Sequence, residues 1–276
     1  MAKLLKIISL VCLTFLIGCN ESNKVRISIK GSDTMLNFIQ LAAEKYMLEN
    51  KNVSISISGG GSSIGIASLI NGTANIATIS RDLKSKEKTL IKNSGKEFKI
   101  IPVARDGVTL VVNKKNPVDS LSLQQLKKIY SGQIVNWKLV NGNDQNIVLY
   151  SRENSSGTYE FFKQKILTKN EDGIPVDFST NIQLLQGTSA VAQAVSSDEN
   201  GIGYGGIGYF ASRNDIKVLK IKSSENKKNV LSRQLFCYIN KNSNPEVIKF
   251  INFLNSGSGQ ALIKKSGFIP LKNNDE

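Results

Sequence analysis

The sequence predicts two α/β lobes, one of them discontinuous, joined by two crossings of the chain. Three observations support this. Apolar strands and amphipathic helices alternate from Val25 onward, which is the order typical of α/β layers. The longest β-branched run, residues 107–113, is followed by a break at Asn116-Pro117. A later apolar run, residues 235–239, can carry the chain back. We expect lobe I over residues 25–110 and 235–276 and lobe II over residues 111–234.

The first lobe is predicted from two periodicities. Val25, Ile27 and Ile29 alternate with polar residues as in a strand, whereas the apolar residues that follow recur at helical spacing. Ser32 or Asp33 can cap that helix. Strands are expected at residues 25–29, 53–57, 76–79 and 99–103, and helices at about residues 36–47, 63–71 and 83–95.

The second lobe and the return to the first follow the same reasoning. Ser122 and Gln125 form a capping-box pattern that predicts a helix start, and Pro245 suits the first position of another helix. Ser258 is expected to cap the last helix. The remaining strands are expected at residues 107–113, 147–150, 201–204 and 235–239, and the remaining helices from Gly157 and over residues 188–195.

The first 24 residues have the pattern of an exported lipoprotein. Lys3 and Lys6 precede an apolar stretch, residues 7–17, that is too short to span a bilayer, and Gly18-Cys19 follows. Leu16 to Cys19 resembles a bacterial lipobox. This predicts a signal peptide at residues 1–18, acylation of Cys19 and a tether at residues 19–24. Diacylglycerol with an amide-linked acyl chain exceeds the two lipid signals that stable membrane anchoring needs.

Composition excludes several functional classes. The chain has no histidine, so neither a Ser-His-Asp triad nor a histidine metal site can form. The net charge of +14 comes from scattered lysines without interleaved aromatic residues, which does not favour nucleic-acid binding. Cys237, the one cysteine left after processing and acylation, lies in an apolar run and is expected to be buried and inert. We expect no cofactor, no metal and no enzyme activity.

Four segments rich in glycine and small hydroxyl residues follow predicted strands, at residues 31–35, 59–65, 80–82 and 151–159. Three of them lead into helices, whose N-termini offer free N–H groups and a positive dipole to an anion. Hydroxyls at Thr34, Ser63 and Thr158 can each donate a hydrogen bond, and Arg152 can form a fork to two oxygens. The pattern predicts an oxyanion held between the lobes.

Asp82 indicates which oxyanion is favoured. A carboxylate repels an anion unless the anion carries a proton that the carboxylate can accept. Phosphate has such a proton at neutral pH and sulfate does not, so Asp82 favours phosphate. Asp82 could instead only cap the next helix, and Arg81 could either reach the ligand or pair with Asp82.

These segments, with residues 107–117, 123–137 and 202–204, resemble the periplasmic phosphate-binding protein of ABC phosphate importers, the PstS family. The resemblance spans nearly all of the processed chain, and its most specific part is Ser151-Arg152-x-x-Ser-Ser-Gly-Thr158. It implies a type II-like periplasmic-binding-protein fold with mixed sheets flanked by helices and a ligand cleft between the lobes. The hinges are expected near residues 104–114 and 232–237.

The resemblance also implies a ligand set and partners. Contacts to phosphate are implied for Thr34, Met35 through its backbone, Ser63, Asp82, Arg152, Ser156, Gly157 and Thr158, and we add the adjacent Ser32, Ser62 and Arg81 as candidates. Some family members have a longer, aromatic-containing loop where this chain has Asp33 and Met35, which leaves the donors of that segment open. The implied partners are inorganic phosphate, the importer's permease and ATPase, and the membrane through the lipid. The family default is a monomer on the periplasmic face.

Other functions remain open from the sequence. The anion could be sulfate, molybdate or a phosphonate, or the protein could be a lipoprotein adhesin or phosphate sensor without a transport role. Gly61-x-Ser63-x-Gly65 matches a hydrolase elbow, but the chain lacks the histidine base that such a serine needs. Gly201 to Gly206 matches a dinucleotide-binding glycine pattern but follows a polar stretch instead of a strand.

Overall fold

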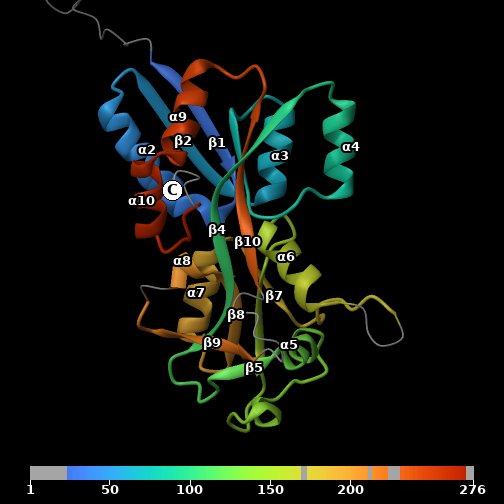
Figure 1. Cartoon of the computed structure of the whole chain (residues 1–276). Coiled ribbons are helices and arrows are strands. Elements are labelled where there is room, and N and C mark those ends of the chain that lie inside the picture. The colour runs from blue at the N-terminus through green and yellow to red at the C-terminus, as the bar shows by residue number, and fades with distance from the viewer. Residues whose placement is uncertain (1–23, 169–172, 211–212, 223–230, 272–276) are drawn as a thin grey trace, which may run out of the picture.

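The structure, a computed structural model, describes residues 24–168, 173–210, 213–222 and 231–271. Two α/β lobes lie one above the other in Figure 1, and the long strands β4 and β10 run between them. In the first part of the chain the elements are β1 (Val25–Gly31), the 3-10 turn η1 (Asp33–Met35), α2 (Leu36–Glu49), β2 (Val53–Gly60), α3 (Ser62–Ile70), β3 (Ile76–Ile79), α4 (Ser85–Asn93) and β4 (Phe98–Asn113).

The elements that follow β4 build the second lobe and then return to the first. They are β5 (Ser120–Ser122), α5 (Leu123–Tyr130), η2 (Trp137–Val140), β6 (Val148–Arg152), α6 (Gly157–Ile166), β7 (Gln183–Leu185), α7 (Gly187–Ser197), β8 (Gly201–Gly206), α8 (Ile207–Phe210), β9 (Ile216–Lys222), β10 (Ser232–Asn240), α9 (Pro245–Asn255) and α10 (Gly257–Lys265).

The described strands form one mixed sheet that continues through both lobes in the order β2-β1-β3-β10-β4-β8-β6-β7. β1 pairs in parallel with β2 and β3, and β6 pairs in parallel with β7 and β8. β4 pairs antiparallel with β10 over Phe98–Gly107 and with β8 over Val108–Val112. One strand therefore serves both halves of the sheet, as the predicted mixed α/β fold requires.

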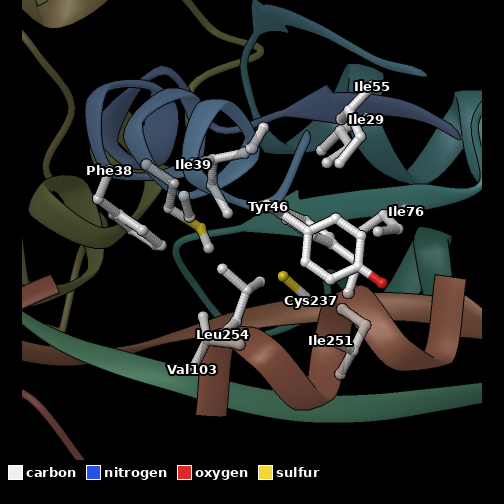
Figure 2. Packing of buried hydrophobic residues seen from close by; sticks show 14 of the residues in the cluster. Ile29, Phe38, Ile39, Tyr46, Ile55, Ile76, Val103, Cys237, Ile251 and Leu254 are labelled. Carbon is white, nitrogen blue, oxygen red and sulfur yellow. The ribbon is translucent and has the colours of Figure 1, made fainter. Parts of the chain in front are cut away.

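The first lobe has its main core between the sheet and helices α2, α9 and α10 (Figures 1 and 2). Figure 2 shows Phe38 and Ile39 of α2 facing Val103 and Leu254, and all four are buried. A smaller cluster under α3 includes Ile66 and covers the other face. Each large apolar side chain that is fully buried contributes about 1.5–3 kcal/mol to folding, so these clusters stabilise the lobe.

Cys237 lies in the same core, as the sequence predicted (Figure 2). The thiol is free and fully buried, and burial raises its pKa to about 12. A thiol with that pKa remains protonated at neutral pH and is a poor nucleophile.

The second lobe has separate core clusters. One gathers Val108, Trp137 and Phe162 with residues of α5 and β8, and Phe162 stacks on Tyr204 with ring centroids 3.8 Å apart. Another packs α7 against the opposite face of the sheet through Val191. The first lobe's cores draw on residues up to Ala104 and from Leu235 onward, whereas the second lobe's clusters lie between Val108 and Leu231.

Most predicted elements are present, with local differences. The strands expected at residues 99–103 and 107–113 are one strand, β4, because β10 and β8 continue the pairing along it. β5, β7 and β9 were not predicted. The Ser122 capping box is confirmed, with Gln125 N donating to Ser122 Oγ over 3.1 Å. Pro245 is confirmed at the start of α9.

Two predicted helix caps are wrong. The last helix begins at Gly257 and is capped by Ser256, whose Oγ accepts from Gly259 N at 3.3 Å, so Ser258 is not its cap. Neither Ser32 nor Asp33 caps the first helix. A 3-10 turn precedes it, and the Asp33 carboxylate instead accepts from Gly60 N. None of the helices in the part of the chain described above is long and apolar enough to cross a bilayer. Cys19 and the predicted signal peptide lie outside the described residues.

Candidate functional site

The four polar segments meet at the boundary between the lobes. η1 follows β1, α3 follows β2, Ser80 follows β3, and α6 follows β6, so each segment leaves the carboxyl end of a strand. The backbone N–H of Ser63 in lobe I donates to the carbonyl oxygen of Ser155 in lobe II, at 3.1 Å. The polar ends of α3 and α6 therefore face each other across the boundary.

A hydroxyl pair joins the lobes at the centre of this boundary. Thr34 Oγ1 and Thr158 Oγ1 are 2.9 Å apart, and both threonines are buried. Arg233 on β10 donates through Nη2 to both hydroxyls, over 3.2 Å to Thr34 and 3.1 Å to Thr158. The same guanidinium donates to Asp106 Oδ2 on β4 through Nη2 at 2.7 Å and through Nε at 3.0 Å.

The Arg233–Asp106 pair is deeply buried, and its ionisation reflects this. Burial raises the pKa of Asp106 and the charge of Arg233 opposes that rise. Burial also lowers the pKa of Arg233, against the effect of Asp106. An arginine keeps its charge across the physiological range even when its pKa falls. Arg233 therefore remains a cation beside the two threonine hydroxyls, with Asp106 as its counter-ion.

Arg152 is fully buried at the end of β6 and binds groups from both lobes. Its Nη2 donates to Asp33 of lobe I at 2.8 Å, and its Nη1 donates to Thr188 Oγ1 at 2.9 Å. Glu153 binds Nε and Nη2 of the same guanidinium. The fork that the sequence assigned to an anion is therefore occupied in this structure by two carboxylates and a hydroxyl, which leaves one N–H of Nη1 for a ligand.

Arg81 is the third buried arginine, and it is held by Glu87 of α4. Both Nη atoms donate to the Glu87 carboxylate at 2.7 Å, and Nη2 also donates to Ser63 Oγ at 2.9 Å. Burial opposes ionisation of Glu87, but the hydrogen bonds from Arg81 and from Lys84 N outweigh it and lower the pKa of that carboxyl. Arg81 is therefore not paired with the Asp82 side chain, although Nη1 donates to the Asp82 carbonyl oxygen.

Ser62 and Gly157 approach each other closely across the boundary between the lobes. Ser62 Oγ accepts from Ser80 N at 3.1 Å, and a Cβ at Gly157 would lie 2.3 Å from that Oγ and 2.5 Å from Ser80 Oγ. Only glycine fits there in this arrangement. Ser156 Oγ caps α6 by accepting from Thr158 N at 3.1 Å.

The remaining candidate residues, Ser32, Met35 and Asp82, differ in burial and in the groups that they can offer to a ligand. Ser32 is buried, and among the described residues its hydroxyl has no hydrogen-bond partner. The Met35 side chain is in the lobe I core, so only its backbone can face a ligand. Asp82 differs most from expectation, because its side chain is exposed at the end of the segment instead of buried in it.

Four residues of this cluster were not predicted from the sequence: Asp106, Thr188, Glu153 and Arg233. A signal existed for two of them. Asp106 is a charge immediately before the longest β-branched run, and Arg233 is a charge beside an apolar strand. A charge in a buried strand needs a partner, so either residue could have suggested the other. Nothing comparable identified Thr188.

A separate hollow lies elsewhere in lobe II. It has a volume of about 580 Å³. It shares no residue with the cluster described above and is not the candidate site. Its lining residues are Lys115, Asn116, Pro117, Trp137, Asn143, Gln145, Ser197, Asp198, Glu199 and Asn200.

Comparison with known proteins identifies the family to which this fold belongs. Residues 20–258 match the PBP superfamily domain. The phosphate-binding protein PstS of Pseudomonas aeruginosa is 33% identical, covering 89% of this chain and 83% of its own, and that of Staphylococcus saprophyticus is 31% identical, covering 94% and 85%. This chain therefore belongs to the PBP superfamily and, within it, to the PstS family of phosphate-binding proteins.

Solved structures give the same result. A Clostridium perfringens substrate-binding protein of a phosphate ABC transporter, solved with bound phosphate, is 33% identical with a TM-score of 0.80 and covers 90% of this chain and 100% of its own. An ABC-type phosphate transport receptor from Vibrio cholerae is 31% identical with a TM-score of 0.69 at the same coverage. The two-lobe fold predicted from sequence is confirmed by these neighbours.

Proposed function

We propose that this protein binds inorganic phosphate outside the cytoplasmic membrane and delivers it to the permease of an ABC importer. The observation that carries the proposal is the convergence of Thr34 and Thr158, from the two lobes, on the buried cation of Arg233. Hydroxyls at the starts of helices beside buried arginines suit a small tetrahedral oxyanion. The relatives named phosphate-binding proteins support phosphate as that anion.

We propose the sequence-derived set as the ligand contacts, with Arg152 as the main cation and the N–H group of Gly157 and the hydroxyl of Thr158 as donors. For the lobe division we propose residues 25–110 with 235–276, and 111–234, with hinges in β4 and β10. The separation of the core clusters supports this division. Closing of the lobes on phosphate would bring Thr34 and Thr158 together, and small-angle scattering with and without phosphate tests it.

The binding role requires no reaction at the site. We propose that the protein is not an enzyme, since its relatives are transport proteins by name and the chain offers no histidine to a nucleophilic serine. If cells that lack the protein lose phosphate uptake and regain it when the protein is expressed again, the transport role is supported. Unchanged uptake favours the adhesin or sensor alternative.

Lipid attachment at Cys19 is part of the proposal, with signal peptide 1–18 and tether 19–24. A monomer on the periplasmic face of the membrane is the proposed state. Mass spectrometry of the processed N-terminus tests the anchor: an acylated Cys19 supports it, and an unmodified terminus rejects it. Cell fractionation of a C19S variant is a second test: release of the variant from the membrane fraction supports the anchor.

The first experiment is calorimetric titration of residues 23–276, stripped of carried-over ligand, with phosphate and then with sulfate. One-to-one phosphate binding with no response to sulfate supports the proposed function. Binding of both anions supports the anion site between the lobes but leaves Asp82 without a role in selection, and binding of neither favours the adhesin or sensor alternative.

The proton-reading role of Asp82 remains a prediction, and its variant D82N tests it. If Asp82 accepts the phosphate proton, D82N gains measurable sulfate binding. If D82N stays as selective as the wild type, the exposed carboxylate of Asp82 has no part in selecting the anion.

A further inference from the structure

Arg233 lies where the two lobes and the two connecting strands come together. It is on β10, directly opposite Asp106 of β4 in the antiparallel register. Just beyond this point β4 exchanges its pairing with β10 for pairing with β8. Figure 1 shows both strands running from one lobe to the other at this level. Arg233 is 6% exposed and Asp106 is fully buried.

The guanidinium contacts every neighbouring part of the site. It binds Asp106 on β4, Thr34 of lobe I and Thr158 of lobe II, and its central carbon is 5.4 Å from the ring centroid of Phe161 on α6. Its Nη1, however, has no hydrogen-bond partner among the described residues. A buried donor left unpaired is costly, so this nitrogen indicates an acceptor that the described residues do not provide.

The two threonine hydroxyls lead to the same conclusion. Each hydroxyl has one proton and two lone pairs, and Arg233 Nη2 is within donating distance of both oxygens. Because Thr34 and Thr158 also bond to each other, one of them uses its proton in that bond. The proton of the other has no acceptor among the residues that the structure describes and can be donated to a ligand oxygen. Arg233 thus occupies lone pairs of the hydroxyl oxygens and leaves one hydroxyl proton for an anion.

We propose that Arg233 is an anion-binding residue supplied by the connecting strand β10, donating through Nη1 to one oxygen of the tetrahedral oxyanion held between the lobes. This inference rests on the proposed function and adds to it. The anion is then bound from three directions, by the helix N-termini of both lobes and by the strand that links them. Binding and the relative position of the lobes are coupled directly through this residue.

The competing explanation is that Arg233 only neutralises Asp106 and supports the fold. Replacing Arg233 by a neutral residue leaves the Asp106 carboxylate buried and unpaired, which destabilises the protein whether or not Arg233 also binds the anion. The variants D106N and D106N/R233Q avoid this, because the double variant exchanges the ion pair for neutral groups of similar size. R233K keeps the charge beside Asp106 but loses the fork. R105Q, on the exposed face of the same region of β4, removes a charge without touching the site.

The experiment measures phosphate affinity by calorimetry and thermal unfolding without phosphate for all four variants. We expect R105Q to bind like the wild type. We expect D106N/R233Q to bind phosphate about 10- to 100-fold more weakly than D106N at a similar unfolding temperature, as expected for a lost charged hydrogen bond. R233K should lose affinity while keeping its unfolding temperature.

Two results overturn the inference. Equal phosphate affinity of D106N and D106N/R233Q means that Arg233 does not contact the anion. If the double variant fails to fold, wild-type phosphate affinity in R233K leads to the same conclusion. A wild-type protein that binds neither phosphate nor sulfate overturns the proposed function together with this inference. Wild-type binding that survives removal of Arg233 overturns this inference alone.

Discussion

Gly157 offers the sharpest test of how the lobes close. It is the first residue of α6, and its backbone does not require glycine, so alanine is compatible with the helix itself. A Cβ there would nevertheless lie 2.3 Å from Ser62 Oγ and 3.2 Å from Ser62 Cβ, both in the opposite lobe. The variant G157A keeps the N–H that is proposed to bind phosphate. It therefore disturbs closure while preserving the ligand contact.

The cost of G157A follows from the contacts of Ser62. If Ser62 Oγ rotates away, it gives up its bond to Ser80 N, and leaving that buried donor unpaired costs about 1–3 kcal/mol. If Ser62 stays, the lobes must separate, which weakens the bond from Ser63 N to Ser155 O and the Thr34–Thr158 pair, at about 1 kcal/mol each. Both routes predict phosphate binding weaker by about 5- to 150-fold.

Calorimetry with phosphate measures this loss, and G257A is the matched control. Gly257 is the first residue of α10, and a Cβ there meets no heavy atom within 4 Å. In the phosphate-free protein with the lobes apart, both variants should be as stable as the wild type or slightly more stable, because alanine restricts the unfolded chain and so stabilises the fold by about 0.4–1 kcal/mol. If G157A binds phosphate as tightly as G257A, the inter-lobe contact described above does not form in the bound protein.

Three further predictions concern the charged groups. R152A should weaken phosphate binding by about 2–5 kcal/mol, because it removes a buried charged contact, and calorimetry showing wild-type affinity would reject Arg152 as a ligand. Lys84 and Glu160 form a part-exposed ion pair between the lobes, with Nζ and Oε1 2.5 Å apart, so K84A should speed phosphate release by no more than about fivefold in stopped-flow measurements, and less so at high salt. Arg81 lowers the pKa of Glu87 below 4.5, so the stability that Glu87 contributes is present above that pH and is lost as the pH falls through its folded pKa. In denaturant titrations the wild type should lose stability on acidification more steeply than E87Q, and parallel losses would contradict this.

The sequence predicts those parts of the fold that local patterns determine. Alternation at Val25, Ile27 and Ile29 identifies β1, and the Ser122–Gln125 pair identifies the start of α5, because both depend on residues close in sequence. Short strands such as β7 have no such signal, since only pairing with β6 creates them. The turn η1 was not predicted for a related reason. The Asp33 carboxylate accepts hydrogen bonds from Gly60 and Arg152, which are distant in sequence, instead of capping the helix.

The candidate site divides in the same way. Thr34, Ser62 and Thr158 are marked by their position after strands, and the structure brings them together. Arg233 and Asp106 come from the strands that link the lobes, where no local motif indicates a ligand. Their relation is visible only when β4 and β10 are placed in register.

The pairing of all three arginines has a consequence for selectivity. Arg81, Arg152 and Arg233 are each bound by at least one carboxylate, from Glu87, from Asp33 and Glu153, and from Asp106 respectively. Unpaired arginines at this boundary would be costly to bury and would attract any anion by charge alone. Because four carboxylates already offset the charge of the three arginines, an anion at the proposed site would gain mainly from hydrogen bonds that fit its oxygens. Recognition would then depend on the number and direction of donors and acceptors, and a protein acceptor is what distinguishes an oxyanion that carries a proton from one that does not.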